Sequence, residues 1–263
     1  MSSQPTFQSR LGTQSDHFTV SGIRFDAIDE QGVVDHVRES LLEGRGGRIV
    51  TANVDIVRQA LRDPRARAYV EAGTLVVADG APVVWASKLA RRGLPARVAG
   101  SDLIWSLSAE LGRLGGSVFL LGGRPGTEYV AARKLADASP GLRIAGALAP
   151  PFGFEKDPAM IREVCEEIAA ADPDVVYVGL GFPKQEWMIS KLAPMLPRTW
   201  FMGCGASIAF VAGTMRRAPV WMQRSGLEWL HRMAREPRRL FARYVLHDAP
   251  LALRLLVLAL LRR

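Results

Sequence analysis

The chain of 263 residues has few cysteines, since Cys165 and Cys204 are the only two and lie far apart in apolar surroundings. Two such residues make neither a zinc ligand pair nor a disulfide framework, so a reducing, cytoplasmic compartment is the simpler expectation. The four histidines show no ligand spacing, and no Ser-His-Asp set or Gly-x-Ser-x-Gly elbow is present. The sequence therefore gives no support to a zinc enzyme or a serine hydrolase.

Long apolar runs are also scarce. The first residues, MSSQPTFQSRLGTQSD, contain no apolar stretch of the kind that a signal peptide needs. The longest apolar run covers residues 250–261 and carries Arg254, whereas a bilayer span needs roughly 18–20 residues. We therefore expect neither a signal peptide nor an integral membrane protein.

The composition is that of an ordinary globular protein, with 48% hydrophobic and 23% charged residues. Collagen-like, disordered and coiled-coil classes are excluded on these values. A chain of this length can bury a full core without disulfides. One main domain with an appendage fits the length better than two equal domains.

The positive charge is concentrated in the last fifth of the chain. Residues 214–263 hold 11 arginines, no lysine and three acids, which accounts for the whole net charge of +8. Such an asymmetry suggests an anionic partner, and lipid headgroups, pyrophosphate and nucleic acid are the alternatives to a merely solvated basic face. Interleaved aromatic residues and the terminal leucine run favour a membrane surface over nucleic acid.

Apolar, β-branched runs alternate with helical patterns along the first 205 residues. The predicted strands cover residues 48–51, 74–78, 117–121, 142–147, 175–179 and 199–203, and the predicted helices include residues 54–72, 102–114, 127–138, 158–171 and 184–192. This alternation predicts an α/β, Rossmann-like fold with a mostly parallel sheet and helices on both faces. From about Arg216 we expect a continuous helical appendage. The predicted divisions are a flexible segment 1–18, a core 19–213 and the appendage 214–263.

Glycine-rich turns follow three of the predicted strands, at Gly122-Gly123, Gly179-Leu-Gly181 and Gly203-Cys-Gly205. Turns of this kind can expose backbone N–H groups to a phosphate. None completes the dinucleotide fingerprint or a P-loop, so each could be only a tight connection. Three at one sheet edge favour a nucleotide or sugar-phosphate ligand, because ligands of such sheets bind at the carboxyl ends of the strands.

Several polar residues fall at the same predicted edge. Asp79 follows a strand and precedes glycine, so it is a candidate general base or an ordinary turn residue. Thr51 and Asn53 end another strand, although Asn53 and Asp102 could equally be helix N-caps. The Asp172-Pro-Asp174 sequence has the spelling of a metal motif but precedes a strand, at the wrong end of the sheet. We therefore expect no metal site.

Together these segments resemble the WecG/TagA/CpsF family of bacterial glycosyltransferases, which add the second sugar to an undecaprenyl-diphosphate-linked glycan. The matching segments run in the right order over residues 20–245: Thr51-Ala-Asn53-Val-Asp55, Ala78-Asp79-Gly80, Arg97-Val-Ala-Gly100-Ser101-Asp102, Gly179-Leu-Gly181-Phe-Pro183-Lys184-Gln185-Glu186, Gly203-Cys-Gly205, Ala212-Gly213, Arg217-Ala-Pro219, Gly226-Leu-Glu228-Trp229 and Glu236-Pro237-Arg238-Arg239.

The resemblance implies an inverting, metal-independent transfer from a UDP-sugar to a polyprenyl-diphosphate-linked sugar, with no cofactor. It implies that Asp79 is the general base and that the appendage closes over the site and docks on the membrane. The implied substrate-binding residues are Thr51, Asn53, Arg97, Asp102, Gly181, Lys184, Gln185, Gly203, Gly205 and Ser207, with Arg217, Arg232 and Arg239 meeting the UDP diphosphate. Donors in the family include N-acetylmannosamine, its uronic acid and hexoses such as glucose.

One turn departs from the family pattern. Many members carry an aspartate before the Ala-Gly pair, where this chain reads Ala206-Ser-Ile-Ala209-Phe-Val-Ala-Gly213, so Ser207 or the backbone would have to hold the nucleotide.

We expect a peripheral protein on the inner face of the cytoplasmic membrane, without a nucleic-acid partner and with homo-oligomerisation left open. The alternatives are a non-catalytic, membrane-associated nucleotide-binding module and a nucleic-acid-binding protein.

Overall fold

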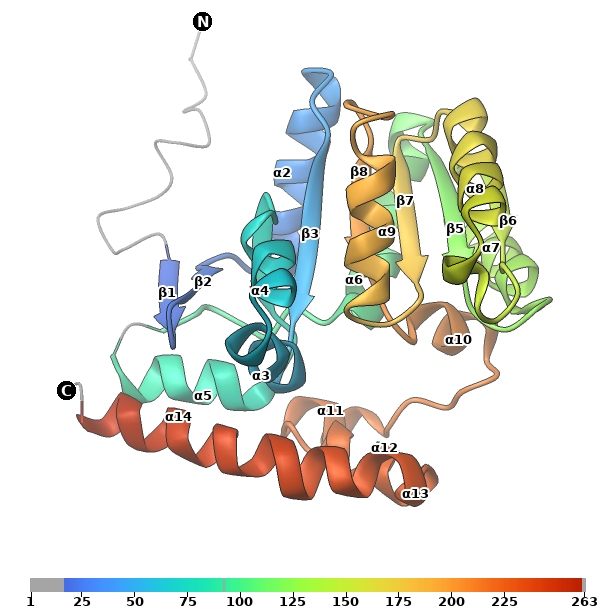
Figure 1. The fold of residues 1–263 in the computed structure, drawn as a ribbon. Coiled ribbons are helices and arrows are strands. Elements are labelled where there is room, and N and C mark those ends of the chain that lie inside the picture. The colour runs from blue at the N-terminus through green and yellow to red at the C-terminus, as the bar shows by residue number, and fades with distance from the viewer. Residues whose placement is uncertain (1–16, 92, 262–263) are drawn as a thin grey trace, which may run out of the picture.

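A computed structural model describes residues 17–91 and 93–261, without the side chains of Arg224 and Arg239 (Figure 1). Its centre is a six-stranded, fully parallel sheet in the order β4-β3-β8-β7-β5-β6. The strands are β3 (Gly47–Ala52), β4 (Leu75–Ala78), β5 (Ser117–Gly122), β6 (Arg143–Leu148), β7 (Val175–Gly179) and β8 (Trp200–Gly203). All six match predicted strands, and the α/β fold class is confirmed.

Helices cover both faces of this sheet. One face packs against α2 (Glu30–Leu42), α6 (Gly100–Leu114), α7 (Thr127–Ala138) and α10 (Ser207–Ala212). The other packs against α4 (Pro64–Glu71), α8 (Pro158–Ala171) and α9 (Lys184–Leu192), with α3 (Val54–Arg62) leading from β3 into α4 and the short η1 (Phe154–Lys156) preceding α8.

The two-sided burial explains why the strands read as continuous apolar runs. In β7, Val175 and Tyr177 contact the α6 side of the sheet, whereas Val176 and Val178 contact the α8 and α9 side. All four are fully buried. A strand buried on both faces shows no alternation of apolar and polar residues, which is typical of parallel sheets.

The predicted single helix over residues 54–72 is wrong, because the chain breaks at Asp63. Pro64 begins α4, and a residue before proline is disfavoured in the helical region. Asp63 takes an extended conformation with φ −125° and ψ 116°. Its side chain accepts a hydrogen bond from the Arg65 backbone N–H, so that it caps α4 while ending α3.

The elements that carry no prediction include the helices α2 and α5 (Ala81–Leu89) and the antiparallel hairpin of β1 (His17–Val20) and β2 (Ile23–Asp26). Phe18 and Val20 are buried against the α3 and α5 side of the core. Residues 1–16 of the predicted flexible segment lie outside the described residues, whereas His17 and Phe18 belong to β1.

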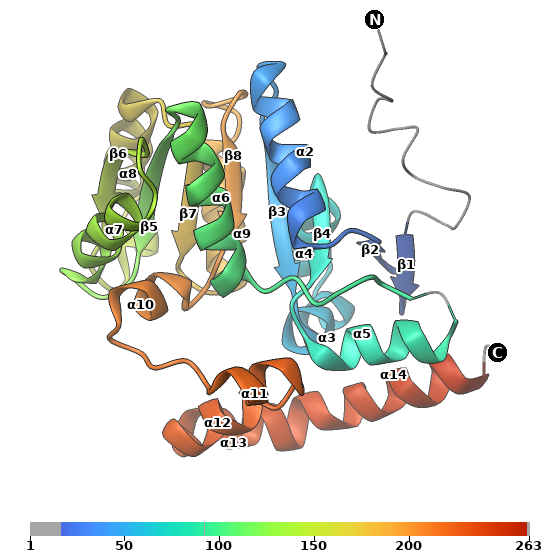
Figure 2. The same ribbon diagram turned by 180° about the vertical axis from the view of Figure 1, so that it is seen from behind.

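The C-terminal region is helical but interrupted, which corrects the expectation of one continuous helix from about Arg216. It comprises α11 (Val220–Arg224), α12 (Glu228–Arg235), α13 (Pro237–Phe241), the π-helical η2 (Ala242–Asp248) and α14 (Ala249–Leu261). The chain turns at Gly226, whose φ is +76°, and again at Glu236 before Pro237. These helices lie beneath the carboxyl edge of the sheet, with α14 alongside α5 (Figures 1 and 2).

The last helical stretch is longer than the sequence suggested. Residues Ala242–Leu261 form one helix of 20 residues that is apolar and long enough to cross a membrane by length and composition. The expectation that no stretch reaches that length counted only residues 250–261 and is therefore wrong. Only 17% of its most apolar 18 residues are buried, so this helix is not a core helix of the described structure.

Candidate active site at the carboxyl edge of the sheet

The candidate site lies at the carboxyl ends of β3 and β8, which are neighbours in the sheet. After β3 the chain passes through α3 to α4, on the face that α9 also covers, whereas β8 leads into α10, which packs with α6 and α7 on the opposite face. Neighbouring strands whose connections leave to opposite faces mark the ligand site of an open parallel sheet. Most of the predicted site residues lie at this edge of the sheet.

Thr51 and Ser207 both lie close to Gly100 at this edge of the sheet. The Thr51 hydroxyl donates to the Gly203 carbonyl oxygen at 3.1 Å, and the Ser207 hydroxyl donates to the Cys204 carbonyl oxygen at 2.7 Å. A Cβ atom added to Gly100 would lie 3.2 Å from the Thr51 hydroxyl and 3.6 Å from that of Ser207. Gly100, the first residue of α6, therefore lies close to both hydroxyls.

Asn53 lies beside Asp79 at the start of α3. Its side-chain oxygen accepts from the Ile56 backbone N–H at 3.1 Å, which makes it the N-cap that the sequence left as an alternative. The Asp79 backbone N–H donates to the Ala52 carbonyl oxygen at 3.0 Å, so the ends of β3 and β4 stay in register here. Asn53 thus has a structural role as the N-cap of α3, and its contact with a sugar stays a prediction.

The acidic residue that directly follows β4 is Asp79. Its side chain is 26% exposed, accepts a backbone N–H from Gly100, and lies 3.6 Å from the nearest guanidinium nitrogen of Arg97. Burial raises the pKa of Asp79 from 3.8 to about 7 against the opposing charge of Arg97, and the Glu228 carboxylate raises it further. A carboxyl group whose pKa lies near neutrality is suited to take a proton from a hydroxyl.

An ion-pair network joins this carboxylate to the C-terminal helices. Arg97 contacts Asp102 at 3.7 Å and Glu228 of α12 at 3.4 Å. Arg217, which precedes α11, forms a two-pronged contact with Asp102 and lies 3.6 Å from Glu228. The structure therefore brings together four predicted residues (Asp79, Arg97, Asp102 and Arg217) from segments more than a hundred residues apart.

Arg232 of α12 completes the basic side of the network. Its guanidinium lies 5.6 Å from the Phe210 ring centroid, and its charge is close enough to Asp79 to oppose the rise of that pKa. Arg239 lies in α13, but its side chain is outside the described part of the structure. Its predicted contact with a diphosphate therefore has no geometry here.

Gln185 supports the third glycine turn, Gly203-Cys-Gly205. Its side-chain oxygen accepts from the Gly205 backbone N–H at 3.1 Å, and its amide nitrogen donates to the Glu186 carboxyl at 3.2 Å. Burial raises the pKa of Glu186 to about 7. A Cβ on Gly203 would come within 2.3 Å of both side chains, so a larger residue here would have to displace Gln185 and Glu186.

Lys184 and Gly181 are not brought into this network. The Lys184 ammonium pairs with Glu155 at 2.7 Å and lies 5.5 Å from the Phe152 ring centroid, towards η1. Gly181 has a φ of +79°, so its turn requires glycine, and a Cβ atom there would meet nothing within 4 Å. Substrate contacts by these two residues stay predictions.

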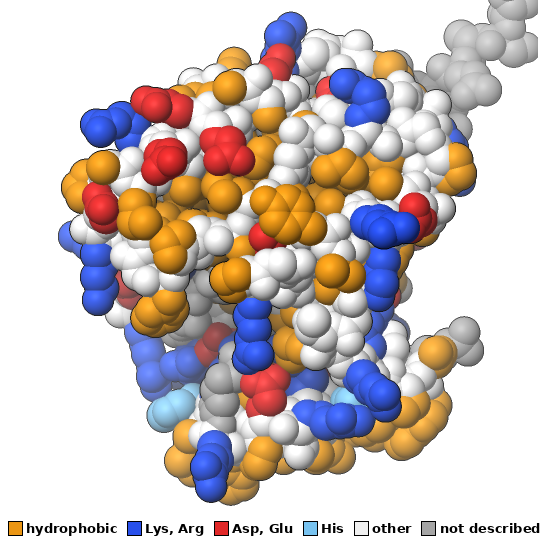
Figure 3. Space-filling view, turned by 90° about the vertical axis from the view of Figure 1, so that its right-hand side faces the viewer, with side chains coloured by type: hydrophobic (Ala, Val, Ile, Leu, Met, Phe, Trp, Pro, Cys, Tyr) orange, Lys and Arg blue, Asp and Glu red, His pale blue; other side chains and the backbone are white. Residues whose placement is uncertain are grey.

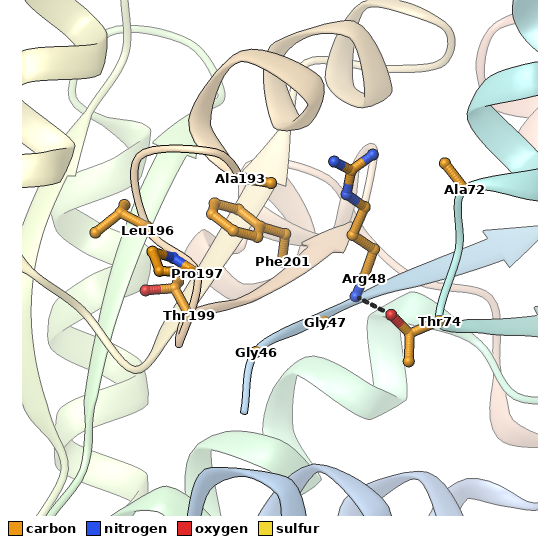
Figure 4. Close-up of a pocket in the computed structure, with 10 residues that line it drawn as sticks. All are labelled: Gly46, Gly47, Arg48, Ala72, Thr74, Ala193, Leu196, Pro197, Thr199 and Phe201. Carbon is orange, nitrogen blue, oxygen red and sulfur yellow. Dashed lines mark hydrogen bonds between the residues drawn. The ribbon is translucent and has the colours of Figure 1, made fainter. Parts of the chain in front are cut away.

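Two further features lie at the opposite edge of the sheet. Asp174 accepts from the backbone N–H and the hydroxyl of Ser117, at 2.7 and 2.8 Å, so the second aspartate of the D-x-D sequence has a structural partner. A cavity of about 320 Å³ also opens there, with the Arg48 side chain rising between Ala72 and Ala193 (Figure 4). Residues 17–91 and 93–261 hold no group of three His, Cys, Asp or Glu side chains placed to bind a metal.

Glu228 is the residue of this network that sequence reasoning did not select. It stands in the Gly226-Leu-Glu228-Trp229 segment, so it was visible as part of a motif. Nothing local distinguishes it from a solvated helix residue. Its importance comes from a contact with Arg97, which is 131 positions away along the chain.

A site that can take a proton from one substrate while arginines hold an anionic leaving group performs the two tasks of a group transferase. Comparison with known proteins defines the class, because the chain matches the Glycosyl transferase WecG/TagA/CpsF family over residues 18–263. The chain belongs to this family, as the sequence resemblance suggested, and is a glycosyltransferase.

Two curated relatives share the printed name N-acetylglucosaminyldiphosphoundecaprenol N-acetyl-beta-D-mannosaminyltransferase. The one from Bacillus spizizenii (strain ATCC 23059 / NRRL B-14472 / W23) is 34% identical over 82% of this chain and 83% of its own length. The one from Bacillus subtilis (strain 168) is 28% identical, with 84% of each chain covered. The similarity to these relatives thus covers more than four fifths of the chain rather than a single motif.

Proposed function

We propose that this enzyme transfers a sugar from a UDP-sugar to a polyprenyl-diphosphate-linked sugar, with inversion and without a metal ion, in the synthesis of a bacterial surface polysaccharide. The observation that carries the proposal is the position of Asp79 beside an arginine network built jointly by the core and the C-terminal helices. The names of the two relatives support the acceptor class and make UDP-N-acetylmannosamine the first donor to test.

The chemistry is a single displacement. The acceptor hydroxyl oxygen attacks the anomeric carbon, its proton passes to the Asp79 carboxylate, and the bond from that carbon to the UDP diphosphate breaks. The electron pair of that bond leaves on the β-phosphate, whose growing negative charge needs cations nearby. Arg97 and Arg232 act on the Asp79 carboxylate, and Arg217 pairs with Asp102 and Glu228 beside it.

The C-terminal helices also carry the surface that would meet a lipid bilayer. Large apolar side chains lie exposed there, among them Val220, Trp221, Phe241, Leu246, Leu253, Val257 and Leu261. Figure 3 shows apolar side chains gathered along the outer side of these helices, with Lys and Arg side chains beside them. An apolar stripe rimmed by arginine is typical of a helix that lies in a membrane interface. We place the enzyme peripherally on the inner face of the cytoplasmic membrane.

The test is UDP release in EDTA from a panel of UDP-sugars with a polyprenyl-diphosphate sugar acceptor. We expect acceptor-dependent release in the wild-type enzyme and a loss of roughly 10²–10⁴-fold in Asp79→Asn, because a general base contributes that much. Asp137→Asn, at an exposed position on α7, is the matched control and should retain full turnover.

The outcomes separate the parts of the proposal. Absence of turnover with every donor in EDTA, followed by turnover when Mg²⁺ is added, would contradict the metal-free mechanism. Unchanged turnover in Asp79→Asn would contradict its role as base and leave the reaction class intact. UDP binding without turnover under any condition would support a binding module.

A further inference from the structure

Glu228 lies between two arginines of the site. Its carboxylate is 3.4 Å from a terminal nitrogen of Arg97 and 3.6 Å from Nε of Arg217. Its side chain is 16% exposed, so it is mostly removed from solvent. It comes from α12, whereas Arg97 belongs to the core, so one carboxylate joins the two parts of the enzyme.

Both of these contacts are long. Charge-assisted hydrogen bonds between guanidinium and carboxylate normally measure about 2.7–2.9 Å. The Nε–H of Arg217 is buried and has no hydrogen-bond acceptor among the described residues, and the same holds for Nε–H of Arg232. Buried donors without a partner are rare in proteins and each needs an explanation. Two of them in one site point to an acceptor that is closer and more highly charged than Glu228.

The network holds as many carboxyl groups as arginines without any ligand. Arg97, Arg217 and Arg232 face the carboxylates of Asp79, Asp102 and Glu228. A diphosphate that entered this site would meet three carboxylates as well as three arginines, and like charges at such distances repel strongly. One carboxylate therefore has to give up its arginine contacts when the diphosphate binds.

Glu228 is the carboxylate best placed to do so. Asp102 holds Arg217 by a two-pronged contact, and Asp79 accepts the Gly100 N–H. Glu228 makes no contact with these arginines shorter than 3.4 Å, faces both Arg97 and Nε of Arg217, and lies on a helix outside the core. A phosphate oxygen in its place could accept from both arginines.

We propose that the Glu228 carboxylate occupies the diphosphate position in the ligand-free enzyme and is displaced when a nucleoside diphosphate binds. This inference rests on the proposed function, since it assigns the diphosphate of that donor to Arg97, Arg217 and Arg232. Glu228 is then an internal competitor, which keeps the arginines neutralised and buried until the donor arrives. The same displacement changes the contacts of α12 when the donor binds.

The test is UDP binding to the full-length protein by titration calorimetry in EDTA, comparing wild type with Glu228→Gln. Glutamine keeps the size of the side chain and removes its charge. We expect the Kd for UDP to fall on the order of tenfold, because a like charge has been removed from beside the diphosphate. The affinity for uridine, which has no phosphate, should not change. Glu167→Gln, at an exposed position on α8, is the matched control and should bind UDP like the wild type.

Glu228→Asp is the second variant, since it keeps the charge but withdraws the carboxylate by one methylene. It should bind UDP with an affinity between those of wild type and Glu228→Gln. Unchanged or weaker UDP binding in both variants would overturn the proposal, because it would make Glu228 a structural partner of the arginines. Absence of UDP binding to the wild type would instead contradict the proposed donor class.

Discussion

The proposed role of Asp79 as general base places two conflicting demands on one residue. To accept a proton near neutral pH its carboxyl must hold the proton more tightly than a solvated aspartate does, and burial beside Glu228 achieves this. The same burial makes the ionised form unfavourable in the folded protein. A group tuned for catalysis in this way lowers the free energy of unfolding at the pH where it works.

We predict that Asp79→Asn stabilises the protein at pH 8. In the unfolded chain the aspartate ionises near pH 3.8, whereas the folded protein holds the proton up to about pH 7. Between these values the unfolded state loses its proton first, so stability falls as the pH rises, and the full penalty applies above pH 7. Asparagine removes that penalty, which we expect to be of order 1–4 kcal/mol.

Urea unfolding at pH 8 and near pH 4 measures this difference. The midpoint of the variant should exceed that of the wild type at pH 8, and the two should nearly coincide near pH 4. Asp137→Asn, whose carboxyl is exposed, should show no such pH-dependent gain. A variant less stable than the wild type at pH 8 would mean that Asp79 is held mainly by favourable contacts.

At the scale of elements, the tail is joined to the core through a half-buried charge cluster. Arg58 of α3 contacts Asp248 of η2 at 3.0 Å and also pairs with Asp55. Arg243 of η2 contacts Asp55 at 2.9 Å. The side chains of Asp55 and Asp248 are at most 10% exposed. Water therefore cannot fully replace either carboxylate as a partner of the two arginines. This cluster fixes the apolar helix against α3, whose first residues border the site.

We predict that Asp248→Asn loosens the tail without unfolding the core. Removing one partner leaves Arg58 and Arg243 with less compensation for their burial, and breaking such a pair costs up to several kcal/mol. Because Arg243 is one-third exposed, we expect a smaller cost, with local opening increased roughly tenfold. Limited trypsin digestion measures this opening, since the tail is rich in arginine.

Cleavage within residues 214–263 should be faster in Asp248→Asn, whereas fragments from the core should appear at the wild-type rate. Asp137→Asn is again the control, because it removes an exposed carboxylate of equal size. Equal cleavage of wild type and Asp248→Asn in the tail would show that the tail is held by apolar contacts with α5 instead.

The elements show where sequence reasoning succeeds. The six strands and helices such as α7 and α8 were predictable because apolar runs and caps are local signals. The hairpin β1–β2 was missed, since its strands have four residues each and gain their order from burial against distant helices. Asp79 could be selected from its place after a strand, whereas Glu228 could not, because its role depends on a tertiary contact with Arg97.

At the scale of the whole molecule, charge and apolar surface are both concentrated at one end. The net charge of +8 belongs to the last 50 residues, and most of the large exposed apolar side chains belong to them as well. On α14, Leu253 and Val257 are 64% and 46% exposed and lie one turn apart. A surface of this kind gains free energy from an anionic bilayer by two routes, burial of apolar area and attraction of arginine to lipid phosphates.

We predict that the double variant Leu253→Glu, Val257→Glu loses most of its binding to vesicles that contain anionic lipid. Two carboxylates on the apolar stripe would have to be desolvated at the interface and would face lipid phosphates. Vesicle sedimentation measures the bound fraction, and UDP binding measures the integrity of the site, which we expect to be retained.

Leu42→Glu is the matched control, because Leu42 is 71% exposed on α2, outside the tail. It should leave vesicle binding unchanged. Equal loss in the control, or full binding by the double variant, would place the lipid contact elsewhere on the molecule.

The C-terminal region that supplies Arg217, Glu228 and Arg232 to the site also carries the apolar outer surface. In the proposed function, the same region thus completes the site and docks on the membrane. Docking on a bilayer would therefore hold the site around Asp79 at a fixed height above the headgroups. An acceptor anchored by its polyprenyl chain would then be met by lateral diffusion in two dimensions. Its turnover would follow the mole fraction of acceptor in the lipid, and diluting the acceptor with inert lipid would slow the enzyme at constant bulk concentration.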